Sequence, residues 1–66
     1  MSTFPEQYVK RIEYVQKMKK RGQEIGPAGV FYVAVCDDLI RRAMKAATEH
    51  DTVAMLSIYK EMEEIN

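Results

Sequence analysis

The chain has 66 residues, a single cysteine and no net charge, with ten Lys and Arg against ten Asp and Glu. A domain of this size buries only about 60% of the surface that its unfolded chain exposes, so it is marginally stable as a monomer. Cys36 excludes an intramolecular disulfide, and Cys36 with His50 provides too few soft ligands for a zinc site, which typically takes four. Oligomerisation or a partner protein is the remaining source of stability.

The absence of net charge argues against a nucleic-acid partner, because such domains are usually strongly basic. The sequence shows no signal peptide and no apolar run near the ~20 residues that cross a bilayer. A lone cysteine fits a reducing compartment. We therefore expect a cytoplasmic protein without a membrane or nucleic-acid partner.

Residues 3–21 are predicted to form the first helix. Thr3 and Glu6 match a capping box at its start. Apolar residues then recur at steps of three and four along one helical face, namely Phe4, Tyr8, Ile12, Val15 and Met18. Gly22 is expected to end this helix, because glycine readily takes the left-handed conformation that closes one.

The second helix is predicted over residues 27–48. It starts at Gly26-Pro27, because proline at the first helical position loses no hydrogen bond. A strand is the alternative for residues 30–35, which are mostly β-branched or aromatic. The apolar spacing nevertheless continues along the whole segment without a breaker, which favours a helix.

A third helix is predicted over residues 51–64, with Asp51 as its N-cap after a tight turn at Glu49 and His50. So short a connection makes the last two helices a hairpin. The predicted fold class is all-α, with three helices and a C-terminal αα-hairpin. We expect one small domain over residues 1–66, packed into a homodimeric or higher helical bundle.

The charged residues of the second helix are spaced for ion pairs. Asp37 to Arg41 and Asp38 to Arg42 each span one turn in the favourable order. His50 lies in the predicted turn, with no partner spaced for proton transfer. We therefore expect no catalytic residues, no metal and no cofactor.

The start of the second helix at Gly26 is the candidate ligand site. Backbone N–H groups at a helix start bind anions, and cations end the preceding helix. A nucleotide or other small anion is expected at Lys19, Lys20, Arg21, Gly26, Ala28, Gly29 and Tyr32. The alternative is structural: Gly-Pro starts the helix, Gly29 lets another helix approach, and the cations complement a helix dipole. The sequence lacks the P-loop pattern.

The apolar run that opens the second helix exceeds what one hairpin buries. Its side chains cover every face of the helix, and the first helix covers about half of that girth. We expect the remainder to mediate self-association, most simply as a two-fold dimer. The residues concerned are Val30, Phe31, Val33, Ala34 and Val35.

These features predict a non-enzymatic, self-associating protein that binds and inhibits or adapts a larger protein partner. Small helical proteins without catalytic residues usually act by occupying another protein's surface. An inhibitor from a phage or other mobile element, directed at a host enzyme or defence system, fits this description. The alternative function is sequestration of a nucleotide or other small anion at Gly26.

Overall fold

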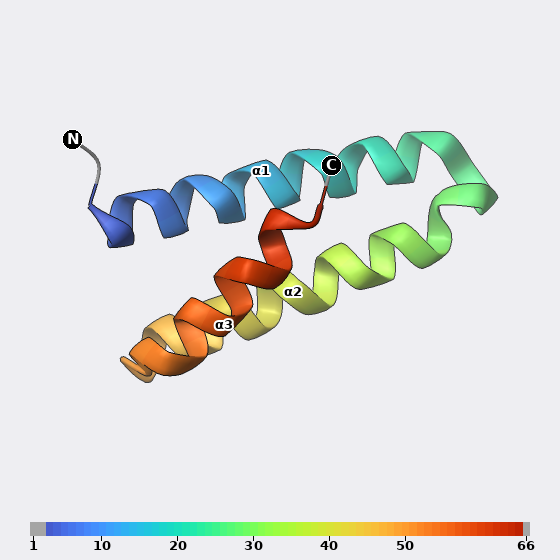
Figure 1. Ribbon diagram of the computed structural model, residues 1–66. Helices are drawn as coiled ribbons and strands as arrows, with labels where there is room; N and C mark the ends of the chain where they lie inside the picture. Colours follow the sequence, from blue (N-terminus) through green and yellow to red (C-terminus); the bar gives the residue numbers. More distant parts are fainter. Residues whose placement is uncertain (1–2, 66) are drawn as a thin grey trace.

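The computed structural model describes residues 3–65 and is all-α. It contains helix α1 (Phe4–Ile25), a short 3₁₀ turn η1 (Gly26–Gly29), helix α2 (Val30–Thr48) and helix α3 (Thr52–Glu63). Helices α1 and α2 form a long antiparallel hairpin, and α3 folds back beside α2 (Figure 1). The predicted fold class, three helices with a C-terminal αα-hairpin, is confirmed.

The core lies where the three helices meet. Its buried side chains are Tyr8, Val15, Cys36, Leu39, Ile40, Ala43, Ala46, Ile58, Met62 and Ile65. The hydroxyl of Tyr8, a residue only 2% exposed, donates a 2.6 Å hydrogen bond to the Ala43 carbonyl oxygen. This bond satisfies the one polar atom that α1 brings into the core, and it fixes α1 against the middle of α2.

The predicted end of the first helix at Gly22 is wrong, because α1 continues to Ile25. Gly26 ends it instead, with a φ of 86° that favours glycine. Gly22 is buried, and a Cβ there would lie 3.0 Å from side-chain atoms of both Tyr32 and Val33. Glycine at position 22 therefore allows α1 and α2 to pack closely, and it does not end the helix.

Helix α2 begins at Val30, three residues later than predicted, because Gly26–Gly29 forms the 3₁₀ turn η1. Gly29 is buried against the backbone of Gly22. The end of α1 and the start of α2 thus approach each other through two glycines. A chain that turns back this tightly has no room for a regular α-helical start at Pro27.

The turn between α2 and α3 is a Schellman motif. The N–H of His50 donates to the carbonyl oxygen of Ala47, and the N–H of Asp51 donates to that of Ala46. His50 takes the left-handed conformation that this motif requires, with a φ of 55°. The predicted Asp51 cap is confirmed, since its carboxylate accepts a 3.1 Å bond from the N–H of Ala54.

At the other helix start, Thr3 is the N-cap of α1, but its side chain forms no capping hydrogen bond. The predicted capping box with Glu6 is therefore wrong in this respect. Pro5 occupies the first turn of α1, where a missing N–H leaves no helical bond unmade.

Helix α3 is too short to cover the whole hairpin. It has 12 residues against 22 in α1, so it is about 18 Å long against about 33 Å. In Figure 1 it crosses the half of the hairpin remote from η1, while the half next to η1 consists of two helices only. The apolar start of α2 lies in that two-helix half.

Candidate functional site: an apolar face at the open end of the hairpin

Large apolar side chains are exposed at the end of the hairpin that α3 does not cover. Phe31 is 81% exposed, Val30 67% and Ile25 65%. Ala34 and Val35 are also exposed and lie one helical turn after Val30 and Phe31. We call these five residues the open face. Contiguous exposed apolar patches on small proteins commonly mark binding sites.

The structure leaves four of the five predicted self-association residues on the open face. Val33 is the exception: it is half-buried, and its side chain lies 3.0 Å from the position that a Cβ on Gly22 would take. The opposite side of α2 packs on α1, through residues such as Cys36 and Ile40. The expectation that one hairpin leaves part of this run uncovered therefore agrees with the exposure of the open face.

A network of charged side chains borders the open face toward α3. Arg42 donates to Asp38 at 2.9 Å and to both carboxylate oxygens of Glu61 at 3.1 and 3.2 Å. Arg41 donates to the second oxygen of Asp38 at 2.9 Å. The bond to Glu61, helped by both neighbouring carboxylates, raises the pKa of the Arg42 guanidinium. The predicted pair of Asp38 with Arg42 is confirmed, and it continues to α3.

The predicted pair of Asp37 with Arg41 is wrong. Asp37 accepts a 2.8 Å hydrogen bond from the ammonium group of Lys19 on α1. This bond and the charge of Lys19 lower the pKa of the Asp37 carboxyl. The packing of α1 on α2 places Lys19 beside Asp37, and the spacing of charged residues along α2 alone does not reveal this contact.

The structure uses several of the predicted anion-site residues for packing and ion pairing. Lys19 is paired with Asp37, Gly29 is buried against Gly22, and the Tyr32 ring also lies against Gly22. Lys20, Arg21 and Ala28 are exposed, and Gly26 is half-buried. Helix α2 starts at Val30, directly after the buried Gly29, and anion binding at these residues stays a prediction.

Cys36 is fully buried beside α1. Burial raises the pKa of its thiol, and the neighbouring Tyr32 and Lys19 offset only part of this shift.

Within residues 3–65, no three side chains of His, Cys, Asp or Glu gather closely enough to hold a metal ion. Within the same range, none of the helices is both long and apolar enough to cross a membrane.

Sequence reasoning missed a hollow between α1 and α3, which we call the polar hollow because each lining residue carries a polar group, although most of its lining surface is apolar. It has a volume of about 260 Å³ and is lined by Gln7, Lys10, Arg11, Tyr14 and Tyr59. The guanidinium carbon of Arg11 lies 5.1 Å from the centre of the Tyr14 ring. The signal was present in the sequence, because Gln7, Lys10, Arg11 and Tyr14 recur at steps of three and four along α1.

No protein-family model, curated protein or solved structure matches the chain.

Proposed function

We propose that this chain is a non-enzymatic protein-binding module that works as a homodimer, and that the dimer binds and inhibits or adapts a larger protein partner. The observation that carries the dimer is the 81% exposure of Phe31 on the open face. Burying an exposed Phe, Val or Ile side chain stabilises by about 1.5–3 kcal/mol. The open face offers several such side chains to one partner.

The size of the molecular surface supports a partner. The chain exposes 4802 Å², whereas a folded monomer of 7.7 kDa is expected to expose about 4300 Å². The excess arises because the molecule is elongated and flat, with extents of 35 × 24 × 16 Å. A stable interface takes about 800 Å² from each partner, which is about a sixth of this surface.

A second copy is the occupant that the charges favour. The chain has no net charge, so two copies meet without long-range repulsion. In a two-fold dimer the same patch lies on both sides of the interface, so each open face covers the other. Ala34, an exposed residue of the patch on α2, has a small side chain, which allows two α2 helices to approach closely.

The border of the open face supports the same pairing. Arg41 is 73% exposed at the side chain, although one of its nitrogens contacts Asp38. Glu64 is exposed at the end of α3, where it lines a hollow together with Val35 and Arg42. Both signs of charge thus flank the apolar residues, as expected for the polar rim of an interface.

The test is a mass measurement of the wild type and two matched variants. Val53 is 78% exposed at the first turn of α3, remote from η1, so Val53→Ser is the control for Phe31→Ser. Light scattering after gel filtration should give twice 7.7 kDa for the wild type and for Val53→Ser at micromolar concentration. Phe31→Ser should weaken dimerisation by at least about tenfold, which is the loss of about 1.4 kcal/mol. A wild type that stays monomeric at millimolar concentration contradicts the dimer, as does equal weakening by both variants.

A further inference from the structure

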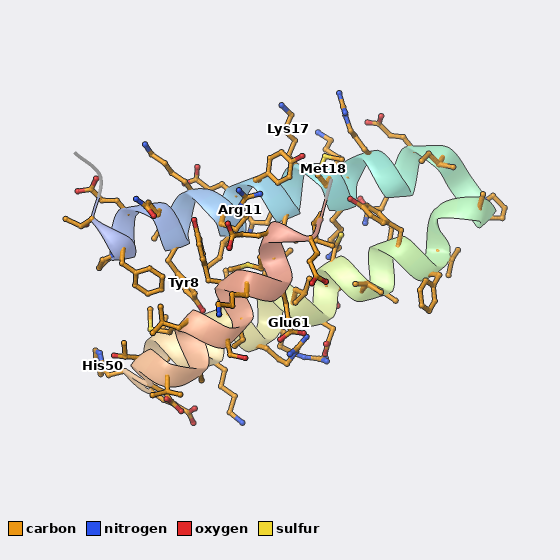
Figure 2. The ribbon with its side chains drawn as sticks, viewed as in Figure 1. Tyr8, Arg11, Lys17, Met18, His50 and Glu61 are labelled. Carbon is orange, nitrogen blue, oxygen red and sulfur yellow. The ribbon has the colours of Figure 1, made fainter. Side chains whose placement is uncertain are left out.

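A stripe of unpaired cations runs along α1 on the side of the polar hollow. Lys10, Lys17 and Arg21 follow one another at helical spacing, with Tyr14 between them and Arg11 beside it. Among the residues that the structure describes, none of these four cations forms an ion pair. We call Lys10, Arg11, Tyr14, Lys17 and Arg21 the basic stripe. Figure 2 shows Arg11 and Lys17 along α1, with Lys17 reaching into solvent.

Three cations elsewhere in the bundle are engaged by carboxylates, whereas Lys20, Lys45 and Lys60 form no ion pair with any residue that the structure describes. Arg41 and Arg42 on α2 bind Asp38, and Arg42 also binds Glu61. Lys19, on the face of α1 that packs on α2, binds Asp37. The basic stripe is therefore where four cations without an ion pair follow one another along a single helix, whereas Lys45 and Lys60 are single unpaired cations on α2 and α3.

Glu6 and Glu13 line one hollow together with Lys10, so they offset part of the charge of the stripe without pairing with it. Glu6 and Glu13 each precede a lysine of the stripe by four residues, yet neither forms an ion pair with it. Helix α1 as a whole carries six Lys and Arg against three Glu. A net positive helix on a chain of zero net charge marks a local preference for a negative partner.

The hollow between α1 and α3 forms a concave site next to the basic stripe. Arg11 is half-buried, and the ring of Tyr14 holds its guanidinium at 5.1 Å by a cation–π contact. Lys10 and Tyr59 lie on opposite sides of the hollow, on α1 and α3 respectively. A guanidinium held in this way loses little side-chain conformational entropy when it binds a ligand. Its planar N–H donors match the two oxygens of a carboxylate.

We propose that the basic stripe binds an acidic segment of the larger protein partner. One Asp or Glu carboxylate enters the hollow against Arg11 and Lys10, and further carboxylates of the segment meet Lys17 and Arg21. Single-stranded nucleic acid fits less well, because base stacking needs free aromatic faces, whereas Arg11 covers one face of the Tyr14 ring and Phe4 packs against Tyr59. The sequence pI of 6.6 is also far below that of most nucleic-acid-binding domains.

This inference rests on the proposed function for the existence of a protein partner and not for the dimer. The probe is a fluorescein-labelled glutamate 20-mer, titrated with the full chain and followed by fluorescence anisotropy. Arg11→Gln should weaken binding at least about tenfold. The double variant Lys10→Gln/Lys17→Gln, at two exposed positions, should do the same and keeps the test decisive if Arg11→Gln disturbs folding.

Two controls separate the basic stripe from general charge and from dimerisation. Lys45→Gln removes an exposed, unpaired cation from α2 and should leave the affinity within about twofold of wild type. Phe31→Ser should also leave it unchanged, so failure of the dimer does not mimic failure of this inference. Raising the salt from 50 to 500 mM should weaken binding of the glutamate 20-mer, because exposed charges are screened.

Three results would overturn the inference. The first is a loss of affinity in Lys45→Gln equal to that in the variants of the stripe, which would mean that any surface cation binds the glutamate 20-mer. The second is tighter binding of a thymidine 20-mer than of the glutamate 20-mer, which would make nucleic acid the partner. The third is dissociation of the dimer by Lys10→Gln/Lys17→Gln, which would make the acidic residues of a second copy the occupant.

Discussion

Gly29 lies directly against Gly22, so that a side chain on Gly29 would overlap the carbonyl group of Gly22. The two glycines lie seven residues apart, one in the last turns of α1 and the other just before α2. Their contact closes the α1–α2 hairpin and brings Tyr32 and Val33 onto α1. The same tight closure leaves Val30 and Phe31 on the outside.

Gly29→Ala should therefore destabilise the fold. A Cβ at this position would lie 2.9 Å from the Gly22 carbonyl carbon, which is backbone that cannot move without shifting a helix. Overpacking of this kind costs about 1–3 kcal/mol, measured as the free energy of unfolding in urea. Ala28→Ser adds one heavy atom at an exposed position of the same turn and should stay within about 0.5 kcal/mol. Equal effects of the two variants would contradict the close approach.

Tyr8→Phe should destabilise the fold by about 0.5–1.5 kcal/mol, the usual net value of one hydrogen bond. The hydroxyl donates to the Ala43 carbonyl oxygen in a site only 2% exposed. Urea unfolding of the variant measures the loss directly. Tyr14→Phe is the matched control, because Tyr14 is 37% exposed, forms no hydrogen bond with any residue that the structure describes and keeps its ring beneath Arg11. A change below 0.3 kcal/mol in Tyr8→Phe would argue against the bond.

The Lys19–Asp37 pair should make Asp37 titrate below its ordinary value of 3.8, because the hydrogen bond and charge of Lys19 lower its pKa. A carboxyl whose pKa is lower in the folded state stabilises the fold above its unfolded-state pKa, and this contribution disappears as the pH falls through the folded-state value. NMR titration of the Asp37 carboxyl carbon measures the shift. Lys19→Met should return it toward 3.8, while Lys20→Met should leave it lowered.

Cys36 should react slowly with thiol reagents in the folded protein. Burial raises the pKa of its thiol, so less thiolate is present at a given pH than in an exposed cysteine. At pH 8 we expect disulfide exchange with a coloured aromatic disulfide to be at least about 100-fold slower than in urea. Ser57→Cys/Cys36→Ala moves the thiol to an exposed position of α3 and should react at the unfolded rate. Rapid reaction of native Cys36 would be inconsistent with its burial.

His50→Gly should stabilise the fold by up to about 1 kcal/mol. His50 has a φ of 55°, a conformation that costs residues with a Cβ about 1–2 kcal/mol, while glycine loses about 0.5–1 kcal/mol more backbone entropy. Glu49→Gly, one residue earlier with a φ of −84°, has no such strain to relieve and should destabilise. Urea unfolding of both variants compares the two positions. Stabilisation by both, or by neither, would contradict the Schellman geometry.

Local features of the sequence predicted the fold class correctly. The apolar spacing of Tyr8 and Val15, the cap at Asp51 and the short turn at His50 depend on neighbours within one or two helical turns. Such interactions recur wherever the same residues stand at the same spacing. The surplus of apolar residues at the start of α2 was likewise evident from the sequence. Consecutive apolar residues in a helix cover all of its faces, and this follows from the sequence without coordinates.

Tertiary structure decided what depends on contacts between distant residues. Gly22 continues α1 because Tyr32 and Val33 pack against it, and Asp37 pairs with Lys19 because α1 lies beside α2. The polar hollow at Arg11 exists because α3 crosses α1 there. The sequence by itself thus determined which segments are helical and that the start of α2 carries more apolar side chains than the hairpin buries. Only the packing of the three helices decided which faces stay open, since burial depends on residues far apart in the chain.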